Sequence, residues 1–458
     1  MTSVASLADV NDVSELLCDR YRLPAELAVI PTAAPEGEPG FFAIDGKRGR
    51  HVAFGACAAD TASTAETAVQ LSRRELGEPL AFQPDAVVAS LRNERYIDNA
   101  LPDQHGWDPQ ALVRRAYYLV RPMLSTRVRR IAQRRALSDW TSLSHPNWPV
   151  DTTVEEIHRQ SLAVAMQAAG VDRTPIVWYW PNDHRGAVIM THDVEQAKGF
   201  AFAPELARID QSFGFPSSFQ IVPEVRYDID GLRLDEIRAA GCEIGLHGLN
   251  HDGHLFASYS EFAERAPKIA HYAQRFEAQG FRSPVMYRNP EWISELDISY
   301  DMSFPNVGHL DPQRGGCCTV FPFFLGDVVE LPTTATQDYS LFHVLGRYDL
   351  DLWIEQLDII ASEHGLASFI VHPDYILDDR GRGCYLELLA LLSERAVRDN
   401  LWKPAPLELA DWWKQRSRMK LEQRGDEWFV AGEGSENASV AWATLDRTEV
   451  TITPPGTA

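Results

Sequence analysis

The chain has 458 residues, of which 45% are hydrophobic and 24% charged, an ordinary composition for a globular protein of two or three domains. Its formal net charge of −22 argues against a nucleic-acid-binding protein, because such a protein needs a basic surface. The six cysteines include no CxxC pair, the first twenty residues include no apolar signal segment, and no apolar run reaches the roughly 18–20 residues of a membrane span. We therefore expect a cytoplasmic protein in a reducing compartment.

The first third of the chain carries no recognisable chemical motif. Residues 1–108 are predicted to form an N-terminal α+β region of unknown role, and residues 109–175 a helical connecting region. The connecting region contains a basic stretch, Arg127–Arg135, which predicts peripheral contact with anionic lipid or an anionic substrate. The alternative is that these arginines pair with the protein's own abundant carboxylates.

From about residue 176 the pattern becomes strand, helix, strand. Helical stretches closed by glycine separate short apolar segments, as in a parallel (β/α) barrel or a strongly curved sheet. We predict this unit over 176–415 and a small β appendage over 416–458. The predicted strands cover residues 187–193, 217–222, 243–247, 281–284, 300–304, 328–331 and 368–372.

The segment AVIMTHDVE, residues 187–195, is the first that could carry chemistry. Its apolar start reads as a buried strand, and active sites of parallel α/β folds lie where such strands end. Asp193 and Glu195 should point to the same side, where two carboxylates repel unless a cation or a shared proton lies between them. A metal site is therefore one interpretation, and a solvated acidic turn is the other.

Two histidines follow the strand predicted at 243–247. His247 and His251 are four residues apart, a spacing that lets two imidazoles converge on one ion. The spacing alone is a weak signal, but its place after an apolar strand puts it at the same end of the barrel as Asp193 and Glu195. One carboxylate and two imidazoles are a common ligand set for catalytic zinc. The alternative is a pair of capping or core histidines.

Two further strand ends carry polar groups. Arg282 lies in FRSP, and His372 lies in VHPD just after an apolar run. A histidine there could act as a general acid, because its ordinary pKa is near neutrality. Alternatively, His372 is a structural residue held by Asp374.

The ordered motifs THDVE, HGLNH, FRSP, ELP and VHPD, within residues 185–375, resemble the polysaccharide deacetylase family, also called the NodB-homology family or carbohydrate esterase family 4. The resemblance implies an α/β fold with a distorted (β/α)7 barrel. It also implies a metal-dependent hydrolase that removes N-acetyl groups from sugars, while relatives act on other amides, including cyclic ureides.

The resemblance carries roles to particular residues. His247 and His251 match the metal histidines, Asp193 the catalytic base, Arg282 the arginine that orients this base, and His372 the general acid.

The chain departs from the family's usual pair of adjacent aspartates, because Val194 stands at the second position. Glu195 fits an Asp-x-Glu form of the motif and is our preferred third ligand, with Asp193 as the alternative ligand. Arg288, in YRNP, is the rival of Arg282, and we also expect Arg288 and Trp292 to contact substrate. His192 and Asp252 are weaker candidates for supporting roles.

The predicted function is therefore a metal-dependent deacetylase acting on an acetylated sugar, with zinc as the expected metal and cobalt, nickel or manganese as alternatives. One rival is a hydrolase of a small amide or ureide, for which the site should be narrow and closed. The other rival, motivated by Val194, is a non-catalytic sugar-binding barrel. A glycan substrate would favour an open groove lined by aromatic residues, for which Trp178, Trp180 and Trp292 are candidates unless they belong to the core.

Overall fold

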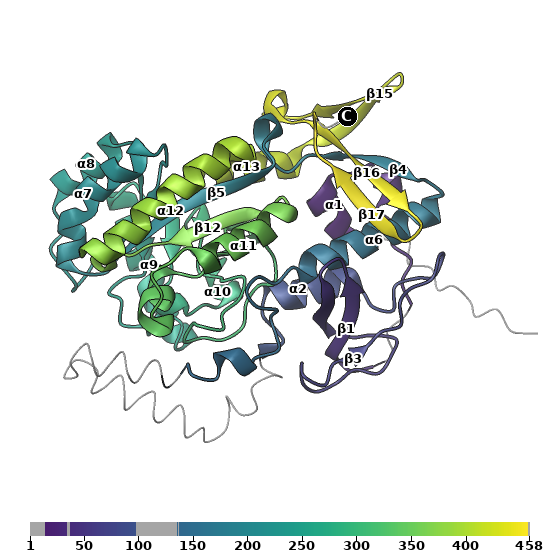
Figure 1. The fold of residues 1–458 in the computed structure, drawn as a ribbon, viewed down its shortest axis with the longest axis horizontal. Helices are drawn as coiled ribbons and strands as arrows, with labels where there is room; N and C mark the ends of the chain where they lie inside the picture. Colours follow the sequence, from purple (N-terminus) through teal and green to yellow (C-terminus); the bar gives the residue numbers. More distant parts are fainter. Residues whose placement is uncertain (1–13, 34–36, 98–134, 136, 457–458) are drawn as a thin grey trace, which may run out of the picture.

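The computed structural model describes residues 14–33, 37–97, 135 and 137–456. The helix predicted over 109–136 and nearly all of Arg127–Arg135 lie outside these residues, so the predicted membrane contact stays a prediction. The described chain forms an α/β fold around a mostly parallel central sheet, with smaller sheets near the two ends of the chain (Figure 1). No described helix is both long enough and apolar enough to cross a membrane.

The central sheet contains the seven strands that the sequence predicts between residues 187 and 372, and each pairs in parallel with its neighbours among them. The strand order is β10, β11, β9, β8, β7, β6, β5, β12. Short strands extend the sheet: β10 lies antiparallel to β11, and β13 pairs with β5. The bounds are β5 (Gly186–Val194), β6 (Ser218–Ile221), β7 (Glu243–His247), β8 (Gly280–Arg282), β9 (Tyr300–Asp301), β10 (Phe323–Leu325), β11 (Val328–Glu330), β12 (Leu366–Ile370) and β13 (Leu401–Trp402).

Strand β5 pairs with β6, β12 and β13, and all nine of its residues are buried. A parallel strand covered on both faces is apolar throughout instead of alternating, which explains the run from Ala187 to Met190. The pairing register sets Asp193 beside Gln220 of β6, and it sets His247 of β7 beside Arg282 of β8. The polar strand ends thus gather at one edge of the sheet.

The two margins of the parallel strands, β11 and β12, approach each other. The segment that follows β11 donates two hydrogen bonds to β12, from the Thr334 hydroxyl to the Leu366 carbonyl (2.7 Å) and from the Ala335 amide to the Ser368 carbonyl (3.1 Å). The sheet therefore curls toward closure, which is consistent with the predicted distorted barrel.

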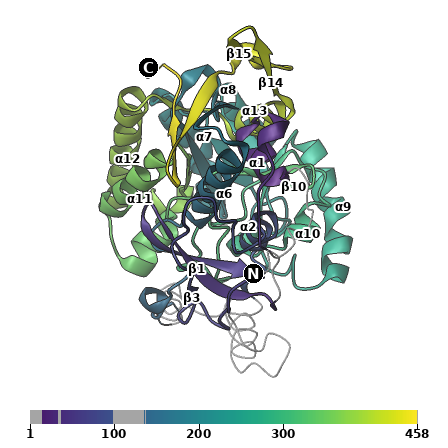
Figure 2. The same cartoon turned by 90° about the vertical axis from the view of Figure 1, so that its right-hand side faces the viewer.

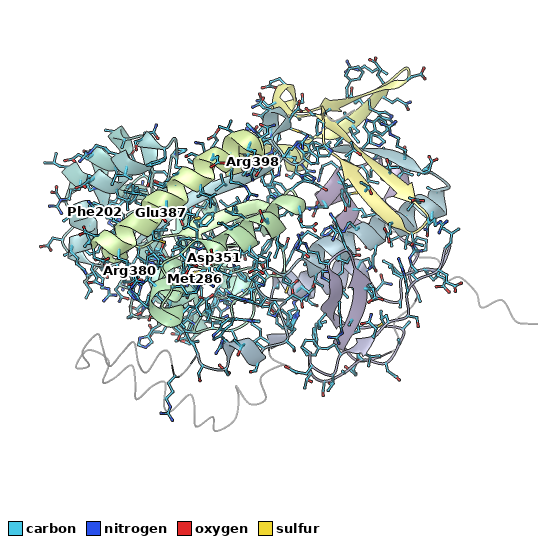
Figure 3. The ribbon with its side chains drawn as sticks, in the orientation of Figure 1. Phe202, Met286, Asp351, Arg380, Glu387 and Arg398 are labelled. Carbon is cyan, nitrogen blue, oxygen red and sulfur yellow. The ribbon has the colours of Figure 1, made fainter. Side chains whose placement is uncertain are left out.

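Helices cover the outside of the curved sheet. Figure 2 shows α11 and α12 on one side of the molecule and α9 and α10 on the other. Helix α12 is amphipathic: Leu388, Leu389 and Leu392 face the core, whereas Glu387 and Arg398 are exposed (Figure 3). The bounds are α7 (Ala197–Ser212), α8 (Gly231–Ala239), α9 (Tyr259–Arg275), α10 (Pro290–Ile293), α11 (Asp351–Ser362), α12 (Asp379–Arg398) and α13 (Pro406–Arg418), with short helical turns η3 (Trp140–Ser142), η4 (Pro181–Asp183), η5 (Pro284–Met286), η6 (Ser340–Leu345) and η7 (Pro373–Tyr375).

The two ends of the chain build smaller sheets. Near the N-terminus, strands in the order β2, β1, β3 pack with α2 and α6 in a separate hydrophobic cluster. Near the C-terminus, β16 pairs with β17 and also with β4, a strand more than 260 positions earlier in the chain. The bounds are α1 (Glu15–Tyr21), η1 (Ala25–Leu27), β1 (Gly40–Gly46), β2 (Gly49–Gly55), β3 (Val69–Gln70), α2 (Pro84–Arg92), α6 (Thr153–Ala169), β4 (Arg173–Val177), β14 (Lys420–Arg424), β15 (Glu427–Ala431), η8 (Ser435–Asn437), β16 (Val440–Asp446) and β17 (Glu449–Thr453).

Candidate functional site

The polar residues predicted from the strand ends lie together at the carboxyl edge of the central sheet. Asp193 and Glu195 come from the end of β5, and His247 from the end of β7. Arg282 ends β8, and His372 follows β12. Because parallel strands end on the same edge, this convergence follows directly from the topology.

Glu195, His247 and His251 form a group that could hold a metal ion, since their ligand atoms all lie within 4.8 Å of one another. Glu195 Oε1 is 2.8 Å from His251 Nε2 and 3.8 Å from His247 Nε2. His247 Nδ1 donates to the Arg282 carbonyl (3.1 Å), so its Nε2 carries the lone pair. This Nε2 is buried without a hydrogen-bond partner. An unsatisfied buried nitrogen facing carboxylates is costly, and a divalent cation would satisfy it.

A strained turn carries His251 back over the end of β7. His251 has a φ of 56°, in the left-handed region, which costs a non-glycine residue roughly 1–3 kcal/mol. The turn begins at Gly248, which also has positive φ, and a Cβ there would lie 2.5 Å from Pro284 Cδ. The turn brings the ring centroids of His247 and His251 to 4.9 Å. Strain of this kind concentrates at functional sites, where the surrounding structure maintains it.

Asp193 is buried beside this group and held by an arginine. Its Oδ1 accepts from Arg282 Nη1 (2.7 Å), and its Oδ2 lies 3.7 Å from His247 Nε2. Arg282 is fully buried and also donates from Nε to the Met302 carbonyl (3.0 Å). Burial acts to raise the pKa of Asp193, but the charge and the hydrogen bond of Arg282 outweigh burial and hold the pKa below its ordinary value. Asp193 is therefore an ionised carboxylate in a fixed orientation.

The rival arginine lies elsewhere. The Arg288 guanidinium is buried and forms an ion pair with Glu94, and it also donates to the Met286 carbonyl (2.8 Å). Of the two arginines, Arg282 is thus the one that contacts Asp193. The buried ion pair also disfavours the predicted contact of Arg288 with substrate.

His372 also lies close to Glu195, with its Nε2 3.6 Å from Glu195 Oε1. Its Nδ1 donates to Asp338 Oδ1 (2.7 Å), and its backbone amide donates to Asp338 Oδ2 (2.8 Å). Burial acts to lower the pKa of His372, but the Asp338 carboxylate outweighs burial and raises the pKa well above its ordinary value. The imidazole is therefore a proton donor at neutral pH.

Asp338 is the residue that sequence reasoning missed. It lies between β11 and α11, outside every motif, and is 34 positions from its partner. The alternative in which Asp374 holds His372 is wrong, because both oxygens of Asp374 are buried without hydrogen-bond partners. In the sequence, the only signal for Asp338 was that it is an acidic residue in the segment after the strand that precedes β12. Several other acidic residues share this position, so the signal could not single out Asp338.

The remaining predicted residues belong to the scaffold around the site. His192 is fully buried and contacts Asp210 (2.7 Å), and Asp252 pairs with Arg265 (2.8 Å). Trp178 and Trp180 are fully buried core residues and line no open groove. Trp292 is partly exposed and packs in an aromatic cluster with Phe256, Tyr259 and Phe262.

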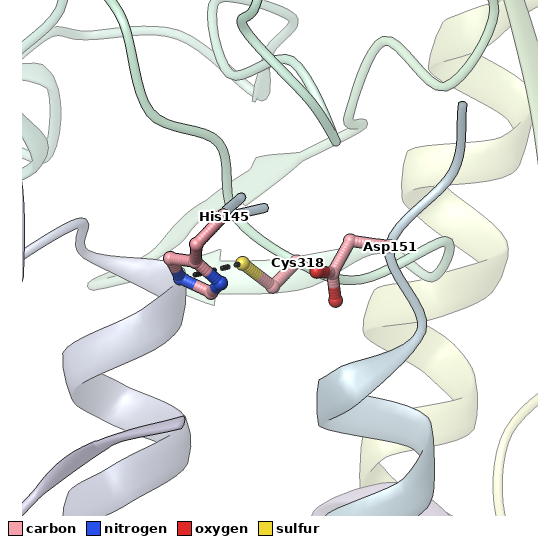
Figure 4. A group of neighbouring side chains, drawn as sticks. All are labelled: His145, Asp151 and Cys318. Carbon is pink, nitrogen blue, oxygen red and sulfur yellow. Dashed lines mark hydrogen bonds between the residues drawn. The ribbon is translucent and has the colours of Figure 1, made fainter. Parts of the chain in front are cut away.

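The described residues contain a second His/Asp/Cys group, formed by His145, Asp151 and Cys318 (Figure 4). Both oxygens of Asp151 already accept backbone amides, from Thr153 (2.7 Å) and Asn147 (2.6 Å), at the start of α6. Cys318 Sγ lies 4.0 Å from His145 Nε2. Because the Asp151 carboxylate already accepts two backbone amides, we interpret this group as a structural one that stabilises the start of α6. The Glu195 group is therefore the stronger candidate for a metal site.

No protein-family profile matches the chain, and no curated protein sequence matches it. Similar solved structures include a protein named as a polysaccharide deacetylase from Mycobacterium smegmatis (19% identity, 52% of this chain and 93% of that chain, TM-score 0.42). An allantoinase (13%, 51% and 92%, TM-score 0.40) and a peptidoglycan deacetylase from Bacillus subtilis (11%, 51% and 94%, TM-score 0.34) are further examples. The structural neighbours are thus polysaccharide deacetylases and an allantoinase, at low identity over about half of the chain.

Proposed function

We propose that the protein is a metal-dependent amide hydrolase whose preferred reaction is removal of the acetyl group from an N-acetylated sugar. The observation that carries the proposal is the unpartnered, buried Nε2 of His247, which faces the carboxylates of Asp193 and Glu195. A proton acceptor and a proton donor flank this point, as the hydrolysis of an amide requires.

Glu195, His247 and His251 would hold the metal. When bound, a divalent ion supplies Lewis acidity, which polarises a substrate carbonyl and, for zinc, lowers the pKa of water to about 7. Two imidazoles with one carboxylate are typical of catalytic zinc, so zinc is the proposed metal, with cobalt, nickel and manganese as alternatives.

Asp193 would act as the general base. It stays ionised beside Arg282, and it would accept the proton of the water that attacks the amide carbon. Arg282 donates to only one oxygen of Asp193, so the other remains directed toward the site. Arg282 is therefore a positioning residue, and a lysine could not reproduce both of its directed contacts.

His372 would act as the general acid. Its protonated Nε2 would donate to the amine nitrogen as the carbon–nitrogen bond breaks, leaving a carboxylate and an amine. Asp338 would hold the ring in orientation and keep it charged. The presence of this charged pair supports a catalytic barrel over a non-catalytic sugar-binding one.

The burial of the site residues favours a small amide or ureide as an alternative substrate to an N-acetylated sugar. Asp193, His247, His251 and His372 are all buried, and Trp178 and Trp180 lie in the core instead of lining a groove. A narrow site of this kind would also suit a small amide or ureide, which is our second candidate. Location in the cytoplasm and the identity of the acyl group remain proposals.

The test is hydrolysis by purified, metal-loaded protein. For N-acetylated sugars the assay measures release of acetate, and for small amides and ureides it measures cleavage of the amide or ureide bond. The His372→Ala variant should lower kcat by about 10²–10⁴-fold with its metal still bound. Hydrolysis of small amides alone would select the second candidate. An unchanged kcat in the variant would remove His372 from the mechanism.

A further inference from the structure

A large cavity lies at the opposite end of the central sheet from the candidate metal site. Its volume is about 890 Å³, within the range of small-molecule binding sites. The walls come from the N-terminal sheet, from α6, from β17 and from the residues just before β12. In Figure 1 this is the region where α6 lies between β1 and β17. Residues 362–364 and Tyr179 precede strands β12 and β5, so the cavity faces the amino ends of strands whose carboxyl ends carry the metal group.

One wall of the cavity carries an arginine with no partner. Arg20 is only 6% exposed, and its Nε is buried without a hydrogen bond. No carboxylate of the described residues lies within ion-pair distance of it. Its guanidinium instead lies over the ring of Phe321, with its central carbon 3.2 Å from that centroid, and beside the ring of Tyr179, 4.4 Å from its centroid; the two rings meet at 65°. A cation–π contact of this kind satisfies none of the guanidinium N–H donors, so they can still pair with a ligand.

None of the described acidic residues of the same cavity forms an ion pair with Arg20. Glu156 and Glu363 both pair with Arg159. Glu155 uses one oxygen to accept from the Thr319 hydroxyl, and its other oxygen is buried without a partner. Burial raises the pKa of Glu155 to about 7, so this carboxyl is partly uncharged at neutral pH, whereas an arginine stays charged.

Other buried cations add to the positive charge around Arg20. Arg416 donates to the carbonyls of Trp178, Val177 and Arg20 and has no carboxylate partner. Burial and the charge of Arg20 together lower the pKa of Arg416 to about 9 and that of Arg92 to about 10. Arg20 and Arg416 are therefore neighbouring buried cations, and neither has a described carboxylate within ion-pair distance.

We propose that this cavity is a second binding site, which takes a small organic anion whose carboxylate or phosphate pairs with Arg20. A carboxylate or a phosphate matches the planar N–H fork of a guanidinium. The volume far exceeds that of a single inorganic ion, and Tyr21, Phe82 and Ile452 supply apolar wall for the body of the ligand. The site does not depend on the proposed hydrolase activity, because the two lie at opposite ends of the strands.

The test uses calorimetric titration of the full-length protein with three probes that share one body: D-glucuronate, D-glucose 6-phosphate and uncharged D-glucose. At least one anion should bind, and glucose should bind at least tenfold more weakly. The anion that binds distinguishes a carboxylate ligand from a phosphate ligand. Native mass spectrometry of the purified protein should detect any anion already bound. Failure of both anions to exceed glucose, with no anion carried by the native protein, would overturn the proposal.

Two variants with opposite expected effects on anion affinity distinguish a direct effect on binding from a loss of folding. Arg20→Gln should weaken anion binding at least tenfold, because a charge-assisted hydrogen bond is lost. Glu155→Gln should strengthen it several-fold, because it removes a competing negative charge. If Arg20→Gln does not fold, as judged by circular dichroism, Glu155→Gln decides alone, and unchanged or weaker binding refutes the site.

Two further variants serve as controls. Arg208→Gln changes an exposed arginine on α7, which pairs with Glu236 away from the cavity, and it should leave anion affinity unchanged. The His247→Ala, His251→Ala double variant should also retain binding. Loss of binding in that double variant would assign the anion to the metal site instead and overturn the proposal.

Discussion

Substitution of Asp338 is the most direct way to change the pKa of His372, the proposed general acid. The variant Asp338→Asn keeps the size of the side chain but removes the charge that His372 Nδ1 contacts at 2.7 Å. A hydrogen bond to a charged group contributes about 1.5–3 kcal/mol, and one pKa unit corresponds to about 1.4 kcal/mol. The pKa of His372 should therefore fall by roughly 1–2 units.

The sign of the effect on activity follows from the role of His372. A general acid works only while it is protonated, so lowering its pKa should shift the basic limb of the kcat profile to lower pH by roughly 1–2 units. At pH values above the native pKa of His372, the loss in kcat should approach about 10- to 100-fold, from the same free energies. Metal content should not change, because Asp338 is not part of the Glu195 group.

The assay is the pH profile of acetate release between pH 5 and pH 9, with metal content measured in parallel. NMR titration of the His372 ring gives the pKa without requiring a substrate. Asp374→Asn is the matched control: Asp374 is two residues from His372 but has no hydrogen bond to it. A basic limb that does not move in Asp338→Asn, or that moves more in Asp374→Asn, would refute the reasoning.

Two further predictions concern buried carboxylates outside the site. Burial raises the pKa of Glu155 from its ordinary 4.5 to about 7, so the folded protein holds a proton that the unfolded chain loses, and stability falls as pH rises across that interval. Glu155→Gln should therefore be more stable than the native protein by up to about 3 kcal/mol at pH 8 but not at pH 4.5, as measured by urea unfolding; an equal difference at both pH values would contradict this account. Glu94→Gln leaves the buried Arg288 guanidinium without its counter-charge and should lower the free energy of unfolding by about 3 kcal/mol with metal content unchanged. A loss below about 1 kcal/mol would show that the ion pair contributes little.

The sequence was sufficient for the central sheet because its signals are local. Several of the parallel strands, above all β5 and β12, contain short apolar runs, because burial on both faces favours continuous apolar sequence. The sequence analysis did not predict β10 and β13, which extend the sheet beyond the seven parallel strands through pairing with β11 and β5. The pairing of β4 with β16 could not be foreseen, because long-range pairing depends on tertiary packing and not on either segment alone.

The convergence of Asp193, Glu195 and His247 follows from the same topology, since the carboxyl ends of parallel strands share one edge. The choice between Arg282 and Arg288 required the register, which sets Arg282 beside His247. Asp338 lies in a connecting segment with no motif, and its contact with His372 depends on how β11 and β12 approach each other. Residues of that kind are visible only in the folded chain.

The central claim is that Glu195, His247 and His251 bind one divalent metal ion. Its most direct test is elemental analysis of the purified protein beside the His247→Ala, His251→Ala double variant, with His145→Ala as a control that alters the second His/Asp/Cys group. We predict about one zinc or similar divalent ion per chain, lost in the double variant and retained in the control. Little metal in the native protein after incubation with zinc, cobalt, nickel or manganese, or metal that persists in the double variant, would contradict the account.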